Sequence, residues 1–106
     1  MEIDCQSVKA KLDDGSDVVL LDCREQSEWE TVRIEGAVLL PMSELRGRVG
    51  ELEQHRGKEI IVYCHHGVRS LSVAGWLKQN GYTGVVSMAG GIDAWAENID
   101  PGMSRY

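Results

Sequence analysis

A cysteine stands directly after a short run of apolar and β-branched residues, ahead of a segment that ends in an arginine. The run is Ile60–Tyr63, the cysteine is Cys64, and the arginine is Arg69. This order predicts a buried strand that delivers a thiol into a tight turn at the N-terminus of a helix. Backbone N–H groups in such a turn lack internal partners, and together with the arginine they favour a thiolate. We therefore expect a nucleophilic cysteine that acts on an anionic group.

The segment between the cysteine and the arginine contains groups that can surround an anion. Four residues lie between Cys64 and Arg69, and Gly67 among them can adopt a positive φ that closes the loop into a cup. The N–H groups of this cup and the helix N-terminus would bind the anion, and Arg69 could add two parallel hydrogen bonds. Ser70 could cap the following helix or donate to the sulfur. Beside Gly67 and Arg69, the substrate-binding residues that we expect are His65, His66, Val68, Ser70 and Arg24.

Short apolar runs alternate with segments of helical spacing along the chain. Buried strands are expected over Val18–Leu21, Ile60–Tyr63 and Val85–Met88, with an extended piece over Gly36–Leu40. Helices are expected from Asp4 to about Gly15, over Glu25–Thr31, from Ser43 to near Gly57, over Leu71–Lys78 and over Ile92–Glu97. Continuous apolar strands that alternate with helices predict an α/β fold, in which helices cover both faces of a mainly parallel central sheet.

Residues with reactive or flexible groups stand at the ends of three of these strands. Cys64 follows one strand, Asp22 and Arg24 end another, and Gly90-Gly91 follow the third. Ligands of parallel sheets bind beyond the carboxyl ends of the strands, so we expect the three segments to meet at one edge. Asp22 is interpreted as a structural group that caps a turn or pairs with an arginine. Arg24 is expected to line the mouth of the pocket.

Four motifs in this order make the chain similar to the rhodanese-like sulfurtransferases in their single-domain form. The motifs are Leu21–Glu25 followed by Glu28, Ile34–Ala37, Tyr63–Ser70 and Ala89–Trp95. The resemblance extends over nearly the whole chain, so it implies a single rhodanese domain over residues 1–106 with about five strands in its sheet. It implies no cofactor.

The resemblance also implies a mechanism in two half-reactions. The thiolate of Cys64 would attack the outer sulfur of a donor such as thiosulfate, sulfite would leave, and the cysteine would carry a persulfide. A thiophilic acceptor, which could be cyanide, a thiol or a sulfur-relay protein, would then remove the sulfur. The expected partners are therefore a small anionic sulfur donor and a sulfur-acceptor protein.

Two places in the sequence depart from the family pattern. The family usually has Gly-His before the isoleucine of the second motif and Pro after it, whereas this chain has Val32, Arg33 and Glu35. The structural role of the histidine is therefore lost or taken over by Arg33. Position 23 is commonly Val in the family, and here it is Cys23. We interpret this residue as a small core side chain, with resolution of a Cys64 persulfide into a disulfide as the alternative.

Other functions use related features. The main enzymatic alternative is a cysteine phosphatase or arsenate reductase of the same fold. Cysteine phosphatases place five residues between cysteine and arginine, and the shorter segment here predicts a smaller cup that suits a sulfane sulfur. A non-catalytic interaction module would lack the cysteine, whereas a persulfide carrier would serve one protein partner. A metal site is not expected, because the adjacent His65 and His66 rarely chelate one ion and no spaced ligand set completes the site.

The composition of the chain limits the remaining possibilities. The formal net charge of −6 argues against nonspecific binding of nucleic acid or of an anionic membrane surface, and the apolar runs are too short to span a bilayer. Three cysteines without paired spacing predict free thiols in a reducing compartment. The first residues lack the basic and apolar regions of a signal peptide, so we expect a cytoplasmic protein. No apolar surface stripe is left over, and a monomer is expected.

Overall fold

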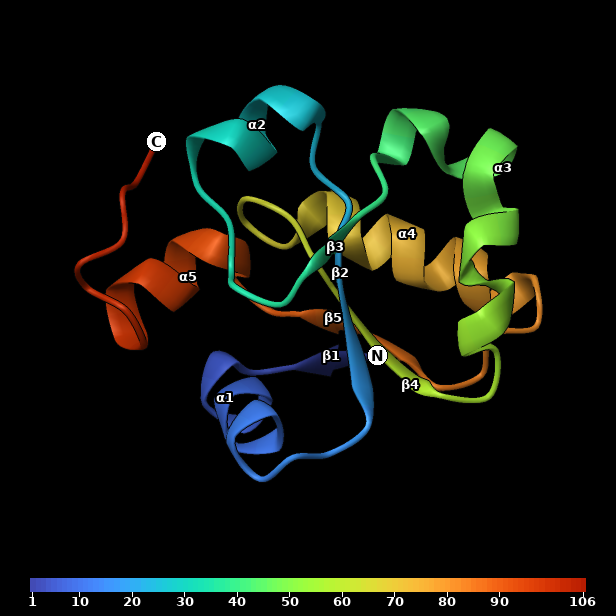
Figure 1. The fold of residues 1–106 in the computed structure, drawn as a ribbon, viewed down its shortest axis with the longest axis horizontal. Helices are drawn as coiled ribbons and strands as arrows, with labels where there is room; N and C mark the ends of the chain where they lie inside the picture. Colours follow the sequence, from blue (N-terminus) through green and yellow to red (C-terminus); the bar gives the residue numbers. More distant parts are fainter.

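A five-stranded sheet, in which every neighbouring pair of strands is parallel, forms the centre of the fold (Figure 1). The computed structural model describes all residues from 1 to 106. The strands are β1 (Glu2–Ile3), β2 (Val18–Asp22), β3 (Val38–Leu39), β4 (Glu59–Tyr63) and β5 (Val85–Met88). They lie in the order β1-β5-β4-β2-β3, so β4 occupies the middle of the sheet. The predicted α/β class with a parallel sheet is confirmed.

Helices cover both faces of this sheet. They are α1 (Cys5–Asp13), α2 (Gln26–Thr31), α3 (Leu45–Arg48), α4 (Val68–Gln79) and α5 (Gly91–Asn98), with the 3₁₀ helices η1 (Met42–Glu44) and η2 (Val49–His55) flanking α3. Residues of α3, η2 and α4 join the core on one face, and residues of α1 and α5 join the core on the other. No helix has both the length and the apolar character that crossing a bilayer requires.

The central strands send alternate side chains to the two cores. In β4, Ile60 and Val62 pack on the side of α4, whereas Ile61 and Tyr63 pack on the side of α1 and α5. β2 pairs with β4 in register along its whole length and shows the same alternation. Because side chains of a strand alternate with a period of two, the residue after Tyr63 points to the side of α4. This residue is Cys64, and it belongs to that core.

Most boundaries follow from local sequence signals. Asp4 caps α1, because its Oδ1 accepts a hydrogen bond of 2.7 Å from the N–H of Ser7, and the helix ends before Gly15. Glu25 and Glu28 form a capping box at the start of α2. The predicted elements at α1, β2, α2, β4, α4, β5 and α5 are confirmed to within a few residues at their ends.

One predicted helix is confirmed only in part. The stretch that starts at Ser43 is divided into η1, α3 and η2, and the hydroxyl of Ser43 donates to Oε1 of Glu25 at 2.6 Å instead of capping a helix. Gly47 and Gly50 weaken α-helical geometry within this stretch. The predicted extended piece pairs with β2 only over Val38–Leu39. β1 has no counterpart among the predicted elements, because a two-residue edge strand leaves no periodic pattern.

A buried ion pair joins the end of β2 to its surroundings. The side chains of Asp22 and Arg24 are both fully buried, and Nη2 of the arginine lies 2.7 Å from Oδ2 of the aspartate. Arg24 also donates to the carbonyl oxygen of Val32 at 2.6 Å and to the hydroxyl of Tyr106 at 2.9 Å. Further bonds to Oδ1 of Asp22 and to the carbonyl oxygen of Glu28 satisfy the remaining donors of the guanidinium.

Replacing Arg24 with methionine (Arg24→Met) should destabilise the fold by about 3–5 kcal/mol, because the carboxylate of Asp22 would stay buried without its partner. The free energy of unfolding from urea titration measures this loss. The matched control is Lys9→Met, which removes a 2.6 Å ion pair with Asp13 on the surface of α1 and should cost less than about 1 kcal/mol. Equal effects of the two substitutions would contradict a supporting role for the buried pair.

Candidate active site

The sulfur of Cys64 lies inside a loop whose backbone donates to it. The N–H of Gly67 is 3.0 Å from Sγ, the N–H of Ser70 is 3.3 Å away, and the Ser70 hydroxyl oxygen is 3.4 Å away. Because α4 begins at Val68, the N–H of Ser70 belongs to a first turn that offers it no acceptor within the helix. The N-cap position is occupied by Gly67. Ser70 therefore contacts the sulfur through its N–H and its hydroxyl, and it does not cap the helix.

These contacts favour the thiolate form of Cys64. The neighbouring thiol of Cys23, followed by the hydroxyl and the N–H of Ser70, holds the pKa of the Cys64 thiol far below its usual range, against the effect of burial. Contact with the Cys64 sulfur, together with burial, raises the pKa of Cys23. One of the two neighbouring sulfurs is therefore charged, and the other keeps its proton.

A second serine supports the first from β5. Oγ of Ser87 lies 2.7 Å from Oγ of Ser70, and both residues are fully buried. The Ser87 hydroxyl can donate to Ser70 while Ser70 donates to the sulfur of Cys64. Ser87 is not among the residues predicted from sequence. The available signal was one hydroxyl within an otherwise apolar strand, since a buried hydroxyl requires a partner.

Two glycine-rich segments fit against each other at the edge of the loop. Gly67 has a φ of +101°, and a Cβ at this position would lie 3.1 Å from the N atom of Gly90. Gly91 has a φ of +62°, and a Cβ there would collide with the carbonyl oxygens of Cys64 and His65. These two carbonyls accept hydrogen bonds of 2.8 and 3.1 Å from the next two N–H groups of α5. The start of α5 therefore holds the loop from outside.

Arg69 pairs with α2 instead of facing an anion. Its Nη1 and Nη2 bond to the two carboxylate oxygens of Glu28 at 2.6 and 2.9 Å. The bonds from Arg69 lower the pKa of Glu28 to about 2, and Glu28 also accepts a 2.7 Å hydrogen bond from the hydroxyl of Tyr106. The expected two-bond grip of Arg69 on an anion is therefore replaced by this ion pair, which neutralises its charge beside the loop.

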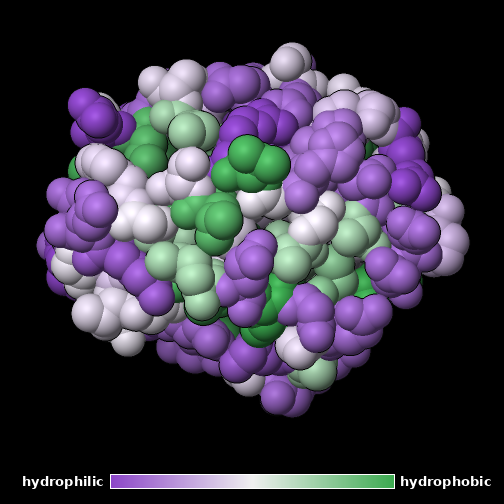
Figure 2. All heavy atoms as spheres, turned by 180° about the vertical axis from the view of Figure 1, so that it is seen from behind, coloured by the Kyte–Doolittle hydropathy of each residue, from purple (hydrophilic) through white to green (hydrophobic).

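Two other expected substrate contacts do not face the sulfur. Arg24 is fully buried, because Asp22 and the neighbouring carbonyl groups hold its guanidinium beneath α2, so it does not line the mouth of a pocket. Val68 is 76% exposed, so its side chain faces solvent. Leu71, one turn further along α4, is also exposed. The face of the molecule in Figure 2 is mostly hydrophilic, with hydrophobic residues gathered near its centre.

The two histidines stack outside the cup. The ring of His65 lies between those of His66 and Tyr106, with centroid distances of 3.8 and 3.9 Å. The ligand atoms of His65, His66 and Asp93 lie within 4.8 Å of one another, so this cluster could hold a metal ion. Asp93 is already paired with Arg105 at 2.9 Å, which reduces the charge available to a metal. Sequence reasoning did not indicate Asp93, because it comes from α5.

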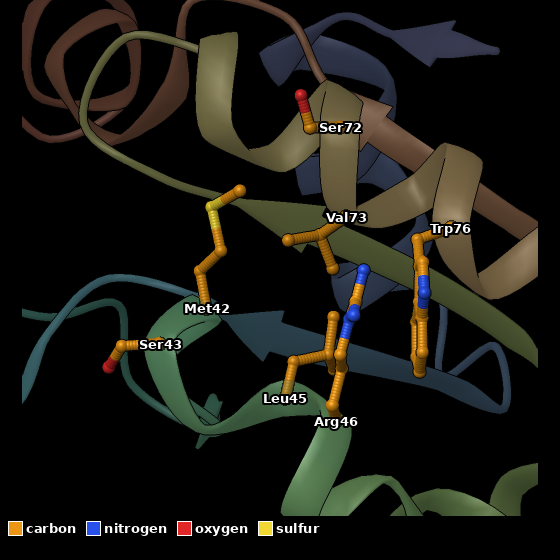
Figure 3. A pocket seen from close by; sticks show the side chains of 7 residues that line it. All are labelled: Met42, Ser43, Leu45, Arg46, Ser72, Val73 and Trp76. Carbon is orange, nitrogen blue, oxygen red and sulfur yellow. The ribbon is translucent and has the colours of Figure 1, made fainter.

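A groove lies between η1, α3 and α4 (Figure 3). It has a volume of about 410 Å³. Figure 3 shows Arg46 reaching from α3 toward α4 beside Trp76. The lining residues are Met42, Ser43, Leu45, Arg46, Ser72, Val73 and Trp76. Cys64 is not among them.

Comparison with known proteins shows which family this chain belongs to. Residues 4–98 match the family described as the rhodanese-like domain. The chain belongs to this family. A sulfurtransferase of Allochromatium vinosum is 37% identical over 97 residues, which cover 92% of this chain and 89% of that protein. The probable adenylyltransferase/sulfurtransferase MoeZ of Mycobacterium tuberculosis is 36% identical over 90% of this chain, which spans only 24% of that protein's length.

A solved structure supports the same assignment. The rhodanese-related protein of Thermoplasma volcanium matches with a TM-score of 0.82 and 32% sequence identity, over 92% of both chains.

The present chain has Val32 and Arg33 where the family usually has Gly-His. The carbonyl oxygen of Val32 accepts a hydrogen bond of 2.6 Å from the buried guanidinium of Arg24. The N–H of Ile34 donates a hydrogen bond of 3.2 Å to the hydroxyl of Tyr63. Arg33 stays exposed over the ring of Trp29, so backbone contacts hold this segment without an interior role for Arg33.

The rate of carboxamidomethylation of Cys64 should rise with pH to a plateau, with a midpoint well below neutral pH, because the thiolate is held by the donors around it. Labelling with iodoacetamide over a pH series, followed by peptide mass spectrometry, measures this profile. Cys5 and Cys23 should remain unlabelled at neutral pH, since the pKa of each is raised. Ser70→Ala should move the midpoint upward, whereas Ser72→Ala, at an exposed site on the same helix, should not. A midpoint at the ordinary cysteine value of about 8.5 would contradict this account.

Proposed function

We propose that this chain is a sulfurtransferase in which Cys64 carries the transferred sulfur as a persulfide. The observation that carries the proposal is the thiolate-stabilising position of Cys64, whose sulfur accepts from the N–H groups of Gly67 and Ser70 at the start of α4. Membership of the rhodanese-like family, in which two of the relatives are named as sulfurtransferases, supports it.

In the first half-reaction, the thiolate of Cys64 attacks the outer sulfur of a donor such as thiosulfate. The sulfur–sulfur bond of the donor breaks, and sulfite leaves with the bonding electron pair. The cysteine gains one sulfur atom, and the negative charge moves to this outer sulfur. Cys64 is only 1% exposed, which favours a small donor with a terminal sulfur.

In the second half-reaction, a thiophilic acceptor attacks the outer sulfur and restores the thiolate. Cyanide would serve as acceptor in an assay, and a thiol or a sulfur-relay protein would serve in the cell. The exposed Val68 and Leu71, in the first turn of α4, offer an apolar surface to such a protein beside the loop. A persulfide carrier for one protein partner is a second form of this function, and ready persulfide formation with slow turnover would identify it. The three free thiols suit a reducing compartment, for which we propose the cytoplasm.

Hydrolysis of a phosphate ester is disfavoured by the loop. Four residues separate Cys64 and Arg69, which makes the loop smaller than that of cysteine phosphatases. Both terminal nitrogens of Arg69 are bound to Glu28, so this guanidinium is not free to bind phosphate oxygens. The arrangement suits a sulfane sulfur better than a tetrahedral phosphate.

Incubation with thiosulfate should add one sulfur atom to the protein, and Cys64→Ser should abolish this gain while the fold stays intact. Intact-mass spectrometry before thiosulfate, after it, and again after cyanide measures formation and removal of the persulfide. Cys5→Ser is the matched control, because Cys5 packs in the core on the opposite face of the sheet and should not affect the gain. A gain that persists in Cys64→Ser would reject Cys64 as the carrier, and no gain in the unchanged protein would favour the phosphatase or interaction-module alternatives.

Arg69 and Glu28 should affect donor affinity in opposite directions. Arg69→Ala leaves the carboxylate of Glu28 without its partner beside the loop, so repulsion of the thiosulfate anion should raise the KM by roughly tenfold. Glu28→Gln removes the carboxylate that neutralises Arg69, so the KM should fall. Steady-state kinetics of sulfur transfer from thiosulfate to cyanide measure both values. If neither substitution changes KM, Arg69 does not act on the donor.

A further inference from the structure

A second cysteine lies beside the reactive one on the neighbouring strand. β2 and β4 are parallel with Asp22 paired to Tyr63, and the N–H of Cys23 donates to the carbonyl of Tyr63 at 3.1 Å. Cys23 and Cys64 are therefore the next two residues in the same register, and both point into the same core. Adjacent strands lie about 4.8 Å apart, which is within the range of Cα separations that a disulfide spans.

Within this pair, Cys23 is closed to reactive groups from solution. Cys23 is fully buried, Cys64 is 1% exposed, and both are free cysteines. The third cysteine, Cys5, packs in the core on the other face of the sheet. An external thiol cannot reach Cys23 in this structure, so Cys64 is the partner with which it can react. Two groups held side by side react at a high effective concentration.

We propose that Cys23 is a resolving thiol, which attacks the persulfide on Cys64 and releases its outer sulfur as hydrosulfide. This inference rests on the proposed function, because it requires a persulfide on Cys64. The bond between the two persulfide sulfurs breaks, a disulfide forms between Cys23 and Cys64, and the proton of the Cys23 thiol leaves on the hydrosulfide ion. One sulfur–sulfur bond is exchanged for another, in which the outer sulfur is reduced and the Cys23 sulfur is oxidised, so no external oxidant is required. A dithiol reductant then returns both thiols.

Loading of the persulfide changes the surroundings of Cys23 in the direction that this step needs. Before loading, contact with the Cys64 sulfur is the largest cause of the raised pKa of Cys23, followed by burial and by the charge on Cys64. After loading, Sγ of Cys64 is bonded to the outer sulfur, and the negative charge lies on that atom. The main cause that keeps Cys23 protonated is then removed, and the outer sulfur can accept the proton as it leaves.

The sulfur bound to Cys64 can leave by two separate reactions, which we call exits. An acceptor from solution attacks the outer sulfur and leaves Cys64 as a thiolate. Cys23 attacks the inner sulfur from within the core and leaves a disulfide. The second exit needs no acceptor but stops after one turnover until a dithiol reduces the protein. Hydrosulfide yield per chain therefore separates the two exits.

The experiment uses the full chain, fully reduced and then freed of reductant under anaerobic conditions. Thiosulfate is added without an acceptor, and sulfite and hydrosulfide are measured over time. Non-reducing peptide mass spectrometry maps the state of each cysteine. We expect one sulfite and one hydrosulfide per chain and a Cys23–Cys64 cross-linked peptide, with a second round of release after dithiothreitol treatment and its removal.

Matched variants test the role of Cys23 directly. Cys23→Val retains an apolar side chain of similar size but removes the thiol that lowers the pKa of Cys64, so sulfite release should be slower. The persulfide should still form and remain on Cys64, with loss of hydrosulfide release and of the cross-link. Cys23→Ser is measured in parallel, so that a folding defect in either variant does not decide the result. Cys5→Ala should behave as the unchanged protein does.

The outcomes separate this inference from the proposed function. Sulfite release with a lasting persulfide, no hydrosulfide and no cross-link in the unchanged protein would overturn the resolving role and leave sulfur transfer intact. Hydrosulfide release that continues in Cys23→Val and Cys23→Ser would assign the discharge to another group and also overturn it. No sulfite and no persulfide in any variant would remove the proposed function, and the inference with it.

Discussion

The active site depends on the contact of two backbone N–H groups with the sulfur of Cys64. The N–H groups of Gly67 and Ser70 reach the sulfur of Cys64 because the loop between strand and helix is tightly closed. A loop closed in this way would relax if its carbonyl groups lacked partners. The start of α5 supplies those partners from outside, and the absence of a Cβ at Gly91 allows it to come close enough. The cup is therefore built jointly by segments that follow two neighbouring strands.

Two ion pairs position β2 and α2 beside the loop that holds the Cys64 sulfur. Asp22 with Arg24 holds the end of β2, and Glu28 with Arg69 joins α2 to the first turn of α4. The hydroxyl of Tyr106 contacts both pairs, since it accepts from Arg24 and donates to Glu28. The first pair is fully buried, and its charges are tolerated because each donor and acceptor is satisfied. These bonds hold the end of β2, after which comes the residue next in register to the reactive cysteine.

Much of the fold could be predicted from sequence because its signals are local. Apolar runs define β2, β4 and β5, and Asp4 with its capping bond defines the start of α1. The helical stretch after Ser43 could be predicted, but its division into 3₁₀ and α segments could not, because glycines within it break a spacing that otherwise indicates one helix. In the site, the position of Cys64 at a strand end and the closing turn at Gly67 follow from their neighbours in the chain. The supporting hydroxyl of Ser87 does not, since it comes from another strand.

The sequence by itself determined the class of fold, the strand that carries Cys64, and the loop of N–H donors that follows it. These depend on the periodicity of side chains and on backbone geometry within a few residues. Only the tertiary structure decided that Arg69 bonds to Glu28 and that Arg24 is buried. The same holds for Cys23 beside Cys64, which depends on strand register. The partner of a charged or polar side chain depends on all the groups that the fold brings near it. When the side chain is buried, pairing is strongly favoured, because an unpaired polar group in the interior costs free energy.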